Sequence, residues 1–130
     1  MKMRVKILGI AVVASLLIGA FSVSAYSEKY WFEVQNYLNG TTVFSLDNLS
    51  TNTKVKADTL NYDKSISSSK AKFTVNLYKN FINNYPVSTT ANNTLYTLGF
   101  GTVPAGNYTL NITKNGSEGH WVNGEGTINQ

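Results

Sequence analysis

The stretch KFTVNLYK at residues 72–79 decides the fold class, because apolar and polar side chains alternate along it one by one. Phe73, Val75 and Leu77 occupy one side of the alternation, and polar residues together with Tyr78 occupy the other. This period of two is the geometry of a β-strand with one buried face. The stretch therefore predicts a strand that buries its three apolar residues and points Tyr78 outward.

The same alternation returns further along the chain, after a turn. Residues 101–113 contain a Pro-Ala-Gly turn signal, and Tyr108, Leu110 and Ile112 then alternate with polar residues. Within this segment, VPAGNYTL at residues 103–110 resembles the turn and strand that recur in many immunoglobulin-like and transthyretin-like extracellular domains. The resemblance implies a β-sandwich in which the tyrosine and the leucine face the core, and it assigns no functional residue.

The rest of the chain carries further strand signals. Residues 29–46 predict a β-hairpin turned by Asn39-Gly40, the dipeptide most typical of a tight turn. Residues 53–60 predict a strand whose exposed lysines would discourage edge pairing. The last strand is predicted at residues 119–128, and loops are predicted at residues 61–69 and 83–93.

These segments together set the fold class. About seven strands, with a turn signal roughly every ten residues, are the pattern of an all-β sandwich or barrel. No stretch has sustained helical periodicity. We therefore predict a single antiparallel β-sandwich of about seven strands, immunoglobulin-like or similar, that forms one domain over residues 26–130.

The N-terminal segment predicts a secretory signal peptide. A basic start is followed by an apolar stretch at residues 7–21 and by small residues up to Ala25. The apolar stretch is shorter than the roughly 20 residues that a transmembrane span needs. We expect cleavage after Ala25, a mature chain that begins at Tyr26 and has no transmembrane segment, and release outside the cell.

The charge balance and the lack of cysteine narrow the class further. Three of the 11 basic residues lie in the predicted signal peptide, which leaves eight lysines, no arginine and 7 acidic residues in the mature chain. Nucleic-acid binding needs a basic stripe and favours arginine, so we expect no nucleic-acid partner. The chain has no cysteine and is therefore disulfide-free. Its wealth of Asn, Lys, Thr and Ser is typical of a secreted bacterial protein.

The residues for catalysis are scarce. His120 is the single histidine, and no cysteine is present, so neither a Ser-His or Cys-His nucleophile nor a zinc site is expected. The aspartates are isolated, which argues against a calcium loop. Two carboxylates would suffice for a glycosidase, but no spacing singles out a pair. The sequence predicts a protein that is not an enzyme and has no catalytic residue, metal site or cofactor.

Aromatic residues on polar registers are the candidate ligand-binding residues. Trp31, Tyr78 and Trp121 each fall on the side of a predicted strand that carries polar neighbours. Flat rings stack on the apolar faces of sugars, and amide and hydroxyl side chains bond to sugar hydroxyls. The same rings would also suit a lipid headgroup interface. A one-residue bulge would instead reverse the register and bury them.

Three functions are compatible with this pattern. The first is a secreted, non-enzymatic binding module that recognises cell-surface or matrix polysaccharide through exposed aromatics. The second is a bacteriocin-like, membrane-active protein, although its low charge argues against a simple cationic mechanism. The third is a structural extracellular matrix protein whose strands assemble edge to edge.

Overall fold

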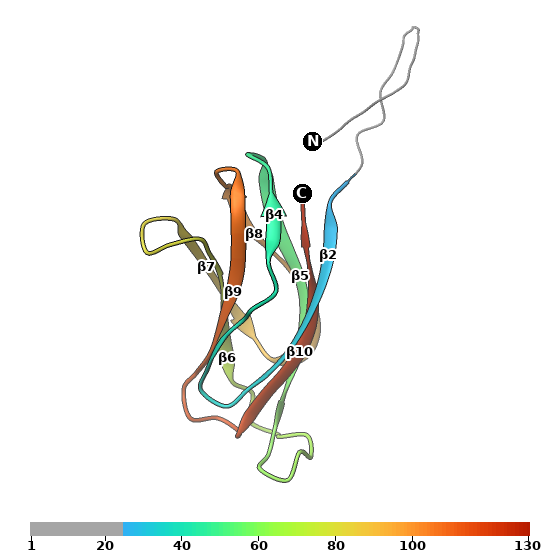
Figure 1. The fold of residues 1–130 in the computed structure, drawn as a ribbon. Coiled ribbons are helices and arrows are strands. Elements are labelled where there is room, and N and C mark those ends of the chain that lie inside the picture. The colour runs from blue at the N-terminus through green and yellow to red at the C-terminus, as the bar shows by residue number, and fades with distance from the viewer. Residues whose placement is uncertain (1–24) are drawn as a thin grey trace, which may run out of the picture.

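The fold of residues 25–130, taken from a computed structural model, is all-β and consists of two antiparallel sheets (Figure 1). Residues 1–24, which hold all but the last residue of the predicted signal peptide, lie outside the described part of the chain. The strands are β2 (Ser27–Val34), β3 (Tyr37–Asn39), β4 (Phe44–Leu46), β5 (Ser50–Leu60), β6 (Lys72–Tyr78), β7 (Asn84–Thr90), β8 (Asn92–Thr102), β9 (Gly106–Asn115) and β10 (Trp121–Asn129).

The first sheet has the strand order β2-β10-β5-β8, and the second has the order β3-β9-β6-β7. The short strand β4 also belongs to the second sheet, because it pairs with the beginning of β9. The two sheets share one hydrophobic core: the rings of Phe32 from β2 and Phe73 from β6 lie 5.7 Å apart between centroids. Both predicted core strands are confirmed, since Val75, Leu77 and Tyr108 are fully buried.

The predicted hairpin over residues 29–46 is wrong. Strand β2 pairs with β10 in the first sheet, whereas β3 and β4 pair with β9 in the second. The chain therefore crosses between sheets where a hairpin was expected. Gly40 makes no hairpin turn, and its amide donates to the carbonyl of Leu110 on β9 at 2.7 Å. A Cβ at Gly40 would lie 2.7 Å from that same oxygen, so the glycine permits the close approach of the two chains.

The predicted loop at residues 83–93 is wrong as well. Most of it forms β7, which lies at the edge of the second sheet, and the beginning of β8. Its polar composition reflects a strand with little to bury, and Pro86 is tolerated there because an edge strand needs fewer backbone donors. The lysine-bearing strand β5 is central, between β10 and β8, so its lysines project from the face of the sheet.

Strand β10 brings Val122 and Ile128 to the core and has glycine at the two inward positions between them. A Cβ at Gly124 would lie 2.6 Å from the Cβ of Ala57 and 2.7 Å from the ring of Phe32. A Cβ at Gly126 would lie 2.8 Å from the ring of Tyr30. The rings of β2 therefore lie directly against the backbone of β10, and larger residues at these two positions would push them away.

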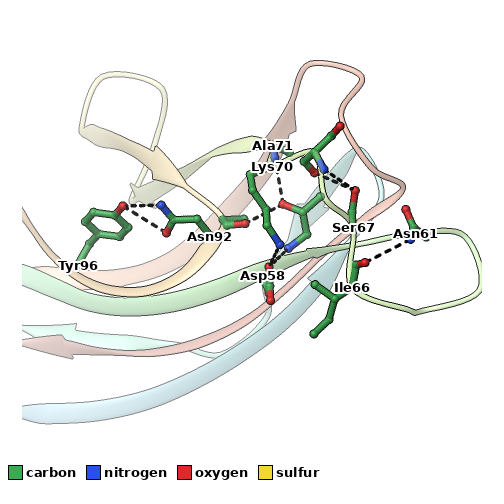
Figure 2. Close-up of polar contacts among 11 residues, drawn as sticks. Asp58, Asn61, Ile66, Ser67, Lys70, Ala71, Asn92 and Tyr96 are labelled. Carbon is green, nitrogen blue, oxygen red and sulfur yellow. Dashed lines mark hydrogen bonds and ion pairs between the residues drawn. The ribbon is translucent and has the colours of Figure 1, made fainter.

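A buried threonine ties the two sheets together at one end. The Thr59 hydroxyl donates to the carbonyl of Ala91 at 2.8 Å and accepts from the amide of Ala71 at 3.0 Å. Nearby, the ammonium of Lys70 lies 2.7 Å from the carboxylate of Asp58 (Figure 2). Because Thr59 lies on β5 and the two alanines flank β6 and β7, this hydroxyl fixes the first sheet to the second.

Candidate functional site

The outer face of the first sheet carries the most exposed tryptophan. Trp31 lies on β2 with 80% of its side chain exposed. Strand pairing places it beside Glu125 on β10, then Lys56 on β5, then Leu95 on β8. Paired residues of antiparallel strands project to the same side of the sheet. The four side chains therefore form one row across the sheet, which we call the Trp31 row.

A shallow hollow of about 410 Å³ lies along this row. Its lining residues are Trp31, Lys56, Ala57, Asp58, Asn93, Asn123, Gly124 and Glu125. The side-chain positions of Ala57 and Gly124 face the core, so these two residues line the hollow with backbone. Within residues 25–130, no hydrogen bond or ion pair holds the side chains of Lys56 and Glu125. The row thus combines one open aromatic face with one cation and one anion that are available to a ligand.

A second row lies beside the first, toward the end of the sheet. Strand pairing places Glu33 beside Asn123, and Asn123 beside Asp58. The Asn123 side-chain amide donates to Glu33 at 3.2 Å, and the Lys64 ammonium lies 3.1 Å from the other carboxylate oxygen. The hydrogen bond from Lys64 is the main cause that lowers the pKa of Glu33 below its usual value. Glu33 is therefore held as a carboxylate within a bonded set.

Trp121 sits at the end of the same face, within a packed cluster. Lys64 lies over its ring, with the ammonium 4.6 Å from the ring centroid. His120 packs edge-on against it at 4.8 Å between centroids, and Tyr62 packs edge-on against His120 at 4.9 Å. Trp121 is only half-buried, as its polar register predicts, but Lys64 already covers one of its faces. It is a weaker stacking surface than Trp31.

Tyr78 does not join the two tryptophans. It lies on β6, and its outward side is the outer face of the second sheet. The sequence placed all three rings on outward registers correctly, but it contained no information on which sheet each strand joins. The structure brings Trp31 and Trp121 to one face and leaves Tyr78 on the opposite one.

Four polar residues of β5 and β10 that line the hollow were not predicted as site residues from the sequence: Lys56, Asp58, Asn123 and Glu125. The alternation of β5 and β10 did place them on outward registers. What could not be read from the sequence is that β10 lies between β2 and β5, which sets these residues beside Trp31.

Among the described residues, no group of three or more His, Cys, Asp or Glu side chains is placed to hold a metal ion. No helix long and apolar enough to span a membrane occurs among residues 25–130. No protein-family model matches the chain, and no curated protein matches it either.

Proposed function

We propose that this protein is a secreted, non-enzymatic β-sandwich module that binds polysaccharide on the outer face of its first sheet. The observation that carries the proposal is Trp31, which is 80% exposed beside the hollow of the Trp31 row. An indole at such a position contributes little to the core. It offers a flat apolar surface of the kind that stacks on a sugar ring.

The polar side chains around the ring support a sugar ligand. Lys56 can donate to hydroxyl oxygens, Glu125 can accept from hydroxyl hydrogens, and Asn123 can do both. All three line the hollow beside Trp31. A ligand with many hydroxyls and alternating apolar faces matches this mixture better than a wholly apolar or a strongly charged ligand does.

The arrangement of carboxylates supports binding without catalysis. Glu33 is bonded by Lys64 and Asn123, and Asp58 is paired with Lys70 at 2.7 Å. The pKa of Glu33 is lowered, whereas the general acid of a glycosidase needs a raised one. The hollow is also shallow, so it offers no enclosed cleft for a transition state.

The proposal is tested by co-sedimentation of the protein with insoluble bacterial cell wall, chitin and cellulose. Trp31→Ala should weaken binding several-fold, since a stacked ring contributes about 0.5–1.5 kcal/mol beyond area burial. Tyr78→Ala is the matched control, because Tyr78 is an aromatic on the outer face of the other sheet. Equal loss in both variants, or no binding of the unmodified protein to any polysaccharide, would refute the proposal.

A further inference from the structure

The hairpin loop between β6 and β7 presents two adjacent apolar side chains to solvent. Phe81 is 83% exposed and Ile82 is 76% exposed, which makes them more exposed than most large apolar residues of the described chain. The loop stands away from the body of the two sheets, at the left of Figure 1 in olive. Residues 79–83, which we call the β6–β7 tip, therefore form a convex apolar projection.

Hydrogen bonds within the hairpin hold the tip in this shape. The side-chain oxygen of Asn80 accepts from the amides of Ile82 at 3.0 Å and Asn83 at 2.8 Å. The carbonyl of Asn83 accepts from the amides of Lys79 and Asn80. The side-chain amide of Asn84 donates to the carbonyl of Phe81 at 2.9 Å. The apolar pair is thus displayed by a structured turn in which four of the five backbone amides of the tip have a partner in its own asparagines.

We propose that the β6–β7 tip inserts into the surface of a phospholipid bilayer. The bonded amides of Lys79, Asn80, Ile82 and Asn83 favour lipid as the partner, because a backbone donor that enters a bilayer must find its acceptor within the protein. A convex tip also suits a deformable layer, which needs no matching cavity. This inference goes beyond the proposed polysaccharide site, which lies on a different surface.

The neighbourhood of the tip fits that orientation. The Lys79 ammonium donates to the carbonyl of Ala105 at 3.2 Å, at the base of the tip, where it would meet anionic headgroups. The amide of Val103, in the same turn as Ala105, donates to Leu49 at 3.2 Å. Leu49 is itself 49% exposed, so a third apolar side chain lies at this end of the molecule.

Vesicle flotation tests the proposal with residues 26–130, which contain the whole of both sheets. The probes are vesicles of phosphatidylcholine alone and vesicles with added phosphatidylglycerol. The double variant F81S/I82S should lower the bound fraction at least about tenfold, since each buried side chain contributes more than the free energy of one tenfold step. Anionic lipid should raise binding about fivefold through Lys79.

The matched control is Ile66→Ser. Ile66 is 69% exposed but lies in the loop after β5, which is at the opposite end of the sheets from the tip. This variant should float with vesicles as the unmodified protein does. Absence of vesicle binding, or equal loss in both variants, overturns the proposal. So does a change of oligomeric state in F81S/I82S without vesicle binding, which would assign the tip to a second copy of the chain.

A labelled cysteine gives an independent measurement. The chain has no cysteine, so Ile82→Cys and Ile66→Cys each carry one environment-sensitive fluorophore at a known position. Vesicles should shift the emission to the blue for the label at position 82 and leave it unchanged at position 66. Trp31→Ala should retain vesicle binding, and F81S/I82S should retain polysaccharide binding, so failure of one proposal is distinguishable from failure of the other.

Discussion

The two sheets meet the same core, but their outer faces use different chemistry. The first face carries two tryptophans together with lysines and carboxylates. Some of these charged groups form ion pairs, as Lys64 does with Glu33, whereas others form no ion pair within residues 25–130. The second sheet has no acidic residue in its five strands, and its outer face consists mainly of Asn, Thr and Ser. Some of those side chains bond to one another, as Thr74 does with Ser88 at 2.8 Å and with Asn115 at 2.9 Å.

This difference indicates which face is available to a ligand. Several polar side chains of the second face are already partnered by their neighbours, so a ligand would have to displace those bonds, although the buried side-chain oxygen of Asn76 has no hydrogen-bond partner within residues 25–130. On the first face, Trp31 offers an open ring, and the side chains of Lys56 and Glu125 are unbonded within the described residues. The sheets also differ on their inner sides, because β9 brings Leu110 and Ile112 to the core in succession, whereas β10 has glycine at the inward positions between Val122 and Ile128.

The largest expected effect is a loss of stability when a glycine on the inner side of β10 is replaced. Gly124→Ala should lower the free energy of unfolding by about 3 kcal/mol, because the added Cβ would overlap Ala57 and Phe32. Gly99→Ala is the control, since a Cβ at Gly99 on β8 would meet nothing within 4 Å, and its cost should stay within about 0.5 kcal/mol. Urea unfolding of both variants measures the difference. An equal loss in the free energy of unfolding for both variants would show that close packing against the glycines of β10 does not distinguish the inner side of the first sheet.

The next effect appears at alkaline pH. Burial raises the pKa of Tyr30 from the ordinary value of 10.0 to about 12. The hydrogen bond with Thr53 acts in the opposite direction and lowers this pKa, but its effect is smaller. A raised pKa contributes stability that is fully present below pH 10 and is lost as pH rises toward 12. The loss should amount to about 2.7 kcal/mol, since each unit corresponds to 1.36 kcal/mol. Urea unfolding at successive pH values measures this slope.

Tyr30→Phe tests whether Tyr30 is the source of the loss of stability at alkaline pH. It should cost about 1–3 kcal/mol at neutral pH, because the buried hydroxyl of Thr53 loses its partner at 2.7 Å. Above pH 10 its stability should fall less steeply than that of the unmodified protein. Tyr108→Phe, in the second sheet, is the parallel variant, since burial also raises the pKa of Tyr108. If Tyr30→Phe leaves the alkaline slope unchanged, the first sheet is not the source of that sensitivity.

The sequence supplied the local pattern of each strand but not the pairing between strands. Inward and outward registers follow from the alternation of Phe73, Val75 and Leu77, and the structure confirms them. Pairing depends on contacts between distant segments, and β2 is joined to β10 across almost the whole chain. For that reason Asn39-Gly40 was mistaken for a hairpin turn, and the row that sets Glu125 beside Trp31 was not predicted.

A smaller effect separates the two outer faces directly. Trp31→Ala should leave the free energy of unfolding within about 0.5 kcal/mol, because the exposed ring contributes little to the core. Its tryptophan emission should lose the component that acrylamide quenches most readily, since Trp121 is half-buried under Lys64. Tyr78→Ala should leave the emission unchanged. If Trp31→Ala unfolds easily, the ring is part of the core, and the difference between the faces no longer favours binding on the first.

The smallest effect is an acid transition confined to the first face. The hydrogen bond from Lys64 lowers the pKa of Glu33 below 4.5, so its contribution is present above pH 4.5 and is lost as pH falls through the folded pKa. Protonation of Glu33 releases Lys64 from it, and because Lys64 also lies over Trp121, the emission of Trp121 should change in that range. Glu33→Gln should abolish this change at low pH.

Asp63→Asn is the control, because Asp63 adjoins Lys64 and its pKa is also lowered, by the hydrogen bond from Ser65. If Asp63→Asn abolishes the change while Glu33→Gln retains it, the loop and not the sheet face governs the Trp121 cluster. The second sheet has no acidic side chain in its strands, so its face should show no transition in this range.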